Sequence, residues 1–434
     1  RFMMLTIVMV GLVGFLSEII VRTFIFGGGR RDSRGGGGVI MIVGLILAVL
    51  APIIAMLVRF AISRQREYLD FIRDYIQKNE SRCILLTATP YNKTYLDLGS
   101  QLRLFVPEDK NLGIRPGERV CLFMDKVPEL YFGFQGILKL GAIAQPLFSA
   151  FGAESLLTRL ADAGTAAILT QKKHVAKVRV LLNDVPTLRH IIIVDDDGLK
   201  PLREKEVALH MEKEPKVESF PIYPAKAETP SVLHYTSGTT GKPKGAQHVH
   251  YSLISQYITA KYVLDLKEDD IYWCTADPGW VTGTSYGIIG PWANGVTQCV
   301  LDAGFKAESW YRFIETHKVT VWYSAPTAIR LLMKEGVEAV RQHDHSALRH
   351  LCSVGEPLNA EAVIWSEKAF GRPFHDTYWQ TETGSIVITN FPGMPIKPGS
   401  MGKAFPGIQA TVVDPKTHEP VATSGSVGLI SLKP

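Results

Sequence analysis

The feature that most constrains this chain is an apolar strand that runs into a loop of glycine, hydroxyl and lysine residues. The strand is Val232–Tyr235, and the segment Tyr235–Gly245 reads YTSGTTGKPKG. Gly238 and Gly241 allow unusual backbone dihedral angles and a close approach to a ligand. Backbone N–H groups and hydroxyls can then surround phosphate oxygens, and ammonium groups add charge. The segment predicts a phosphate-binding loop that uses Thr236, Ser237, Gly238, Thr239, Thr240, Gly241, Lys242 and Lys244.

This segment is not a Walker loop, because Lys242 is followed by Pro243 where that loop has Ser or Thr. The alternative is a flexible loop without a ligand. Such a loop does not require eleven residues in this order, so the phosphate site is favoured.

Around this loop, strand-like runs alternate with stretches of helical spacing. Val120–Met124 has the pattern of a buried strand, and Glu129–Leu140 has helical apolar spacing. Further strand-like runs follow at 141–146, 168–170 and 190–194. Such alternation predicts an α/β fold with a largely parallel sheet. Residues 201–230, rich in Glu, Lys and Pro, are predicted to be a solvated connector.

The first segment is strongly apolar. Val39–Val58 is an uncharged run of twenty residues. At about 1.5 Å per residue, such a helix spans roughly 30 Å, the hydrocarbon thickness of a bilayer. Phe2–Phe26 is a second run, interrupted by Glu18 and Arg22. We expect a two-helix transmembrane hairpin in residues 1–69, with residues 2–58 contacting the lipid bilayer. A signal peptide and a buried hairpin are the alternatives, and arginines on both sides of the second run leave its orientation open.

Two short stretches resemble fragments of other families. Ala61–Leu69 resembles the HtpX-type membrane zinc proteases, and the resemblance implies that Glu67 is a zinc ligand. The remaining ligands would come from an HExxH helix, which this chain lacks, so protease activity is discounted. Within 70–111, Ser81–Asn92 resembles a superfamily-two helicase fragment, but an ordinary strand and linker is favoured because no GxxxxGKS/T loop is present. We expect the chain to be a chimera of three fragments.

Charge and cysteine usage exclude some functions. Residues 1–69 contain eight Arg, no Lys and three acidic residues, which accounts for the whole net charge of +5. The remainder is electrically neutral, so nucleic-acid binding is not expected. The five cysteines are far apart and form no CxxC, which argues against zinc ribbons and disulfide frameworks.

Three motifs in order resemble the adenylate-forming superfamily over residues 112–434, which implies the large N-terminal domain of that fold. The first is the loop at 235–245. The second, Ser353–Leu358, looks like the adenine-contacting turn, which implies that Gly355, Glu356 and Pro357 line the base. In the third, Asp376–Gly384, Thr381 would contact phosphate and Glu382 would hold Mg²⁺, a hard cation suited to oxygen ligands. The resemblance also assigns nucleotide contacts to Asp376, Thr377, Tyr378, Trp379 and Gln380. A capping or surface carboxylate is the alternative for Glu382.

Finer matches look like acetyl-CoA synthetases. These are Ala276–Gly283 (ADPGWVTG) and Tyr323–Arg330 (YSAPTAIR). The resemblance implies an acyl pocket lined by Trp280, Val281 and Thr282 and closed by Trp379, which leaves room for about two carbons. Because pocket selectivity is about 1–3 kcal/mol per methylene, propionate could also enter. Core packing is the alternative for the Trp379 indole.

The resemblance implies a two-step reaction with ATP, Mg²⁺ and CoA. Acetate attacks the α-phosphorus of MgATP to give acetyl-adenylate and pyrophosphate, and the CoA thiol then displaces AMP. The first step needs charge stabilisation and in-line positioning, which Thr381, Glu382 and Lys244 would supply. CoA phosphates could meet a basic patch, although a solvated helix face is the alternative for its members, Lys172, Lys173, Lys177 and Arg179.

Family members continue beyond the position that matches Pro434 into a hinge and a small C-terminal domain with a catalytic lysine. We therefore expect an acetate–CoA ligase of reduced activity. Its catalytic part should be cytoplasmic, and the hairpin should anchor it to a membrane. The alternatives are a non-catalytic, membrane-tethered nucleotide-binding remnant and, less favoured, a zinc protease.

Overall fold

The computed structural model describes residues 112–433 apart from 199–200, 210–221, 237–241 and 422–424. These residues belong to one compact unit, 82–434. The predicted membrane hairpin in 1–69 and the helicase-like piece at 70–111 lie outside the described residues. So does most of the predicted phosphate loop. None of the described helices has the length and apolar character needed to cross a membrane.

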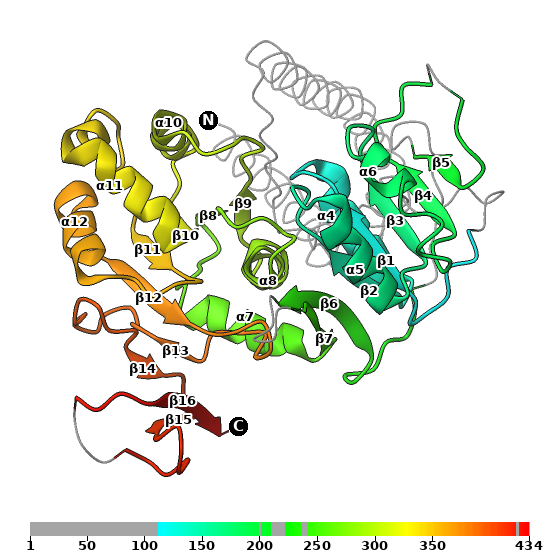
Figure 1. Ribbon diagram of the computed structural model, residues 1–434. Helices are drawn as coiled ribbons and strands as arrows, with labels where there is room; N and C mark the ends of the chain where they lie inside the picture. Colours follow the sequence, from blue (N-terminus) through cyan, green and yellow to red (C-terminus); the bar gives the residue numbers. More distant parts are fainter. Residues whose placement is uncertain (1–111, 199–200, 210–221, 237–241, 422–424, 434) are drawn as a thin grey trace, which may run out of the picture. The chain divides into compact units, whose positions relative to one another are not determined.

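The first sheet contains seven strands in the order β5-β4-β3-β1-β2-β6-β7 (Figure 1). All neighbours pair in parallel except β6 and β7, which form an antiparallel hairpin at one edge. This confirms the predicted, largely parallel α/β sheet. The strands are β1 (Arg119–Phe123), β2 (Ile143–Pro146), β3 (Ala167–Thr170), β4 (His190–Ile193), β5 (Glu206–Ala208), β6 (Pro230–Thr236) and β7 (Lys244–Val249).

Strand β5 corrects the predicted connector at 201–230. It extends the sheet by pairing with β4. Glu206 is buried there because Arg179 binds both oxygens of its carboxylate, at 2.7 and 2.9 Å. The charged composition that suggested a solvated connector therefore includes a carboxylate that is buried because it pairs with Arg179, a residue outside this region.

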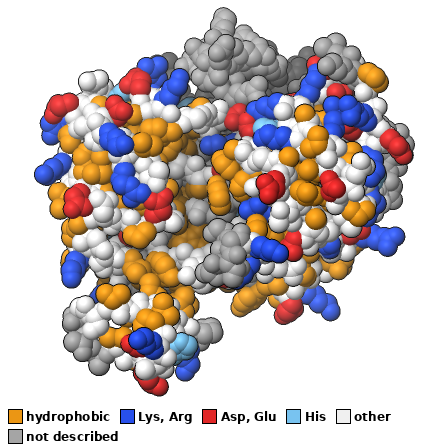
Figure 2. Space-filling model, viewed as in Figure 1, with side chains coloured by type: hydrophobic (Ala, Val, Ile, Leu, Met, Phe, Trp, Pro, Cys, Tyr) orange, Lys and Arg blue, Asp and Glu red, His pale blue; other side chains and the backbone are white. Residues whose placement is uncertain are grey.

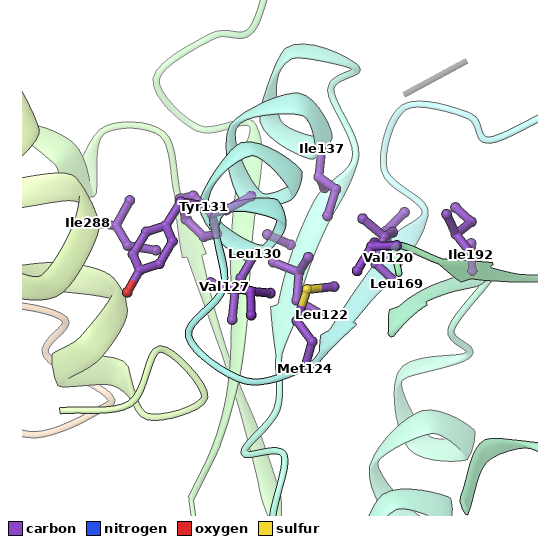
Figure 3. Close-up of a cluster of buried hydrophobic side chains, with 14 of the residues drawn as sticks. Val120, Leu122, Met124, Val127, Leu130, Tyr131, Ile137, Leu169, Ile192 and Ile288 are labelled. Atoms are coloured by element: carbon purple, nitrogen blue, oxygen red, sulfur yellow. The ribbon is translucent and has the colours of Figure 1, made fainter. Parts of the chain in front are cut away.

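The helices of this half are α4 (Pro128–Lys139), α5 (Ala153–Ala163) and α6 (Val175–Arg179). Helix α4 has Pro at its first position, where the missing N–H has no cost. It buries Leu130, Phe134 and Ile137, which follow helical spacing, against the sheet. Figure 3 shows Leu130 and Ile137 of this helix beside Val120 and Leu122 of β1, and Tyr131 beside Ile288.

The second sheet also contains seven strands, in the order β14-β13-β12-β11-β10-β8-β9. Strands β8 to β12 pair in parallel, and β13 and β14 are antiparallel additions. Its core includes Trp273 and Trp322, stacked with ring centroids 5.9 Å apart. The strands are β8 (Ile271–Cys274), β9 (Thr297–Cys299), β10 (Val321–Ser324), β11 (His350–Ser353), β12 (Phe374–Tyr378), β13 (Ile388–Thr389) and β14 (Lys403–Ala404).

Helical segments accompany this second sheet, and a two-stranded antiparallel ribbon follows it. The helical segments are α7 (Ser252–Tyr262), α8 (Val281–Thr284), the π-helix η2 (Ser285–Ile289), α9 (Gly290–Ala293), α10 (Ala307–His317), α11 (Pro326–Arg341) and α12 (Ala360–Phe370). The ribbon consists of β15 (Gln409–Val413) and β16 (Leu429–Lys433). On the face drawn in Figure 2, acidic and basic side chains are interspersed.

The segments that follow β2 and β8 meet main chain to main chain. A Cβ added to Gly279 would lie 2.3 Å from the backbone nitrogen of Phe148. Glycine is therefore required at this position, and it brings the carboxyl ends of strands from both sheets together.

Candidate active site

The predicted phosphate loop closes the β6–β7 hairpin. Thr236 and Lys244 are paired residues at the ends of the two strands, and the predicted loop lies between them in the sequence. Thr236 is half-buried, and Lys242 and Lys244 are exposed. Ser237, Gly238, Thr239, Thr240 and Gly241 lie outside the described residues. Two exposed ammonium groups therefore follow the loop directly, where they can approach an anion.

The same hairpin contacts the turn that follows β12. A Cβ added to Gly384 would lie 2.8 Å from Cε1 of His248. Burial lowers the pKa of His248. A hydrogen bond to the backbone of Thr381 and the nearby charge of Glu382 act in the opposite direction but do not outweigh burial. The imidazole is therefore neutral at pH 7. This contact brings the phosphate-loop hairpin beside the predicted Thr381–Glu382 pair.

Two further side chains hold this turn from the other side. Gln256 of α7 and Ser285 of η2 both donate hydrogen bonds to the carbonyl oxygen of Gly384, each at 3.2 Å. Thr381 is half-buried, and Glu382 is exposed. The buried Gly384 is thus an anchor from which the Thr381–Glu382 part of the turn reaches solvent.

The predicted adenine turn follows β11. Gly355, Glu356 and Pro357 are exposed, and a Cβ added to Gly355 would have no atom within 4 Å. Thr327 donates a hydrogen bond of 2.5 Å to Glu356, and Arg330 pairs with the same carboxylate. These contacts lower the pKa of Glu356 by more than burial raises it. The turn has open space beside it, and its carboxylate is already held by the protein.

The residues at the end of β12 have mixed roles. Burial raises the pKa of Asp376 to about 6, although backbone N–H groups of Leu358 and Thr377 favour its charged form. The Thr377 hydroxyl is buried and donates to the Ser353 carbonyl at 2.8 Å. Thr377 therefore has a structural contact that sequence reasoning did not predict.

The next side chains, Tyr378 and Gln380, contact each other. The Tyr378 hydroxyl accepts a hydrogen bond of 3.0 Å from Gln380 Nε2. Gln380 is exposed, whereas Tyr378 is half-buried and packs against the core of the second sheet.

Trp379 lies in a buried aromatic cluster. Its ring meets that of Tyr286 edge-on, with centroids 5.2 Å apart and an interplanar angle of 79°. Its Nε1–H donates to the Tyr323 hydroxyl at 3.3 Å. Val281, half-buried at the start of α8, packs against this cluster, and the adjacent Thr282 is also half-buried.

Trp280 lies elsewhere. It is 47% exposed, and its ring packs against Phe148 and Phe151 at centroid distances of 5.8 and 6.0 Å. The structure therefore brings Val281 and Trp379 into one cluster and turns Trp280 towards the first sheet.

The basic residues suggested for CoA have internal partners. Among the described contacts, Lys177 donates to the carbonyl oxygens of Ser149 and Phe151 at 3.1 and 3.2 Å. The other three form ion pairs: Lys172 with Asp197, Lys173 with Asp125, and Arg179 with Glu206. These contacts occupy the four cations within the protein and therefore count against the predicted CoA patch.

The donor set fits a nucleotide-bound metal better than a protein-held one. Within 112–433, where the chain is described, no group of three or more His, Cys, Asp or Glu side chains is arranged to hold a metal ion. Mg²⁺ commonly takes one or two carboxylates together with substrate phosphates. The exposed carboxylate of Glu382 matches that requirement. Glu67, the predicted zinc ligand, lies outside the described residues.

Sequence reasoning missed His248, Tyr286 and Tyr323. His248 lies on the strand after the loop, and its approach to Gly384 is a tertiary contact between residues distant in sequence. Ser285 and Tyr286 belong to a π-helix, a rare geometry that is often found at functional sites. A histidine shortly after the loop was the one available sequence signal.

Two largely parallel sheets with their helices, and the β6–β7 hairpin packed beside a Thr-Glu turn, are the architecture of the large domain of an adenylate-forming enzyme. The profile of the family described as "AMP-binding enzyme" matches residues 109–433. The chain belongs to the AMP-binding enzyme family.

Relatives of known description agree with this assignment. The chain is 47% identical over 315 residues to acetyl-coenzyme A synthetase of Bacillus subtilis, covering 70% of this chain and 53% of that protein. It is 38% identical over 343 residues to acetyl-coenzyme A synthetase 2 of Pseudomonas aeruginosa, covering 75% and 53%. The crystal structure of Brucella canis acyl-CoA synthetase matches with a TM-score of 0.68 and 30% identity, covering 78% of this chain and 60% of that one. The chain spans about half the length of the curated relatives it matches.

Proposed function

We propose that this chain carries the adenylating site of an acetate–CoA ligase. An acetate oxygen attacks the α-phosphorus of ATP, and the bond from that phosphorus to the bridging oxygen breaks to release pyrophosphate. The CoA sulfur then attacks the acetyl carbonyl, AMP leaves, and the thiol proton passes to solvent. The names of the relatives and the family membership support this reaction class.

The observation that carries the proposal is the contact between the loop hairpin and the turn after Trp379. His248 follows the loop by a few residues and packs on Gly384. Gly384 ends the turn that begins after the buried indole. Thr381 and Glu382 therefore lie beside β7, the strand that follows the loop. A triphosphate that extends from the loop along this strand would reach them.

The site residues take the following proposed roles. Lys242, Lys244 and the loop hydroxyls bind phosphate oxygens, and Thr381 donates a hydrogen bond to phosphate. Glu382 would hold Mg²⁺, which neutralises charge on the phosphates when bound. The exposed turn at 355–357 receives the adenine, and the indole of Trp379 limits the acyl chain, with Val281 and Thr282 beside it.

Acetate-dependent exchange of pyrophosphate into ATP tests the reaction directly. Calorimetric binding of 5′-O-(N-acylsulfamoyl)adenosines with acetyl, propionyl and butyryl chains tests the site without turnover. We expect the acetyl analogue to bind most tightly, with discrimination of about 10-fold or more per methylene. Binding without exchange would instead favour the non-catalytic nucleotide-binding alternative.

A matched pair of indole deletions tests the acyl pocket. Trp379→Ala should remove the preference for the acetyl analogue, because the wall of the pocket is lost. Trp280→Ala deletes an indole that packs against Phe148 and Phe151 and should leave the preference unchanged. Equal behaviour of the two variants would contradict the assignment of the pocket.

A further inference from the structure

Three aromatic rings form a closed set around the predicted acyl wall. Trp379 contacts both Tyr286 and Tyr323. The two tyrosine rings also meet edge-on, with centroids 5.8 Å apart. Tyr286 and Tyr323 are fully buried, so each hydroxyl must find its hydrogen-bond partner inside the protein.

The hydrogen bonds of Tyr323 have only one consistent direction. The Ser353 carbonyl can only accept, so Thr377 Oγ1 donates its single proton to it, at 2.8 Å. Thr377 Oγ1 must then accept from the Tyr323 hydroxyl, at 2.7 Å. Tyr323 Oη is left to accept from Trp379 Nε1–H, at 3.3 Å. The indole is thus the first donor of a chain that ends on the backbone of β11.

Tyr286 uses its hydroxyl in a parallel but separate chain. Thr259 Oγ1 donates to the Ser255 carbonyl at 2.6 Å, so it accepts from the Tyr286 hydroxyl at 2.7 Å. The backbone N–H of Ile386 donates to Tyr286 Oη at 2.8 Å. Tyr286 therefore supports Trp379 through its ring alone, whereas Tyr323 holds the indole by its polar edge.

We propose that Tyr323 is a positioning residue that determines acyl-chain specificity, because its hydroxyl fixes the orientation of the Trp379 indole. The inference rests on the proposed function, since it concerns the same acyl pocket. Ring packing alone leaves the indole free to tilt when a longer chain presses on it. The donor–acceptor chain resists that tilt, since turning the indole leaves its buried N–H without a partner.

The test is the analogue series of acetyl-, propionyl- and butyryl-sulfamoyl adenosine, bound to the full 434-residue chain and to two variants that each lose one buried hydroxyl. In Tyr323→Phe, discrimination between the acetyl and butyryl analogues should fall about 3- to 10-fold, the factor that corresponds to one neutral hydrogen bond. Tyr286→Phe is the matched control. It removes bonds to Thr259 and Ile386 and should leave discrimination unchanged.

A second pair of variants breaks the chain one residue further along. Thr377→Val removes the acceptor of the Tyr323 proton and should loosen discrimination as Tyr323→Phe does. Thr377→Ser keeps a hydroxyl and should retain the wild-type preference. This pair decides the matter if Tyr323→Phe fails to fold, which thermal unfolding of each variant reveals.

The outcomes separate the inference from the proposed function. Unchanged discrimination in Tyr323→Phe and Thr377→Val would overturn the inference, as would an equal loss in Tyr286→Phe, which would indicate general loosening of the core. If no analogue binds, or if Trp379→Ala keeps the acetyl preference, the proposed function fails and the inference fails with it.

Discussion

The contact between Gly384 and His248 makes a quantitative prediction for Gly384→Ala. Gly384 has a φ of +71°, and an L-residue in this left-handed region costs about 1–2 kcal/mol. The added Cβ would also lie 2.8 and 2.9 Å from two atoms of the His248 ring, and overpacking of this kind costs about 1–3 kcal/mol. The two effects together should lower the free energy of unfolding by about 2–5 kcal/mol.

Gly371→Ala separates the two effects. Gly371 caps the end of α12 with a φ of +69°, and a Cβ there would have no atom within 4 Å. It therefore carries the backbone cost alone, about 1–2 kcal/mol. The difference between the two variants measures the steric cost at His248.

Denaturant unfolding followed by tryptophan fluorescence is the assay, because all seven tryptophans lie between 273 and 379. The double variant Gly384→Ala/His248→Ala completes a cycle, and it should recover about 1–2 kcal/mol relative to the sum of the single changes. Equal destabilisation by Gly384→Ala and Gly371→Ala would refute the steric cost at His248. So would a double-mutant cycle without coupling between residues 384 and 248.

Two further predictions concern charge. Burial lowers the pKa of His343, whereas hydrogen bonds to Glu315 and Glu308 raise it. The hydrogen bonds and the negative charges together outweigh burial, so the pKa lies above its ordinary value. A raised pKa in the folded state adds stability that is complete below the ordinary value near 6.5 and is lost as the pH rises through the folded pKa. The Tm deficit of His343→Gln relative to wild type should therefore be larger at pH 6 than at pH 8.5, and equal deficits would refute the ion pairs. Glu382→Gln should lower ATP affinity about 10-fold in Mg²⁺ but little in EDTA. The control, Glu367→Gln at an exposed position of α12, should bind ATP as wild type does under both conditions. A loss of affinity that persists in EDTA would contradict the proposal that Glu382 binds the metal.

Local patterns predicted the first sheet well. The runs at 120–124 and 190–194 are β1 and β4 within a residue, because apolar strands in parallel sheets are buried on both faces and read as continuous apolar runs. The region 201–230 was misread, because the ion pair that lets Glu206 enter a strand depends on Arg179, a residue distant in sequence. Composition cannot show such a partner.

Candidate site residues could be proposed from the sequence where they are consecutive, and not where their approach depends on the fold. The turn at 381–384 is such a consecutive group, and its role stays a prediction. The approach of His248 depends on strand pairing between β6 and β7, and the roles of Tyr286 and Tyr323 depend on the packing of two distant elements. Trp280 and Val281 are neighbours in sequence, but Trp280 packs against Phe148 and Val281 packs against the cluster that contains Trp379. A sequence motif does not show that two adjacent side chains point to different neighbours.

The bare-backbone junction at Gly279 and Phe148 has a consequence for protein engineering. No side chain can adjust there to a new neighbour, since even a methyl group would lie 2.3 Å from a main-chain nitrogen. A hybrid made by exchanging halves between members of the family should therefore take the backbone around 147–148 and the segment around 279 from the same parent. If these two stretches came from different parents, the two backbones that meet at Gly279 and Phe148 would no longer fit each other.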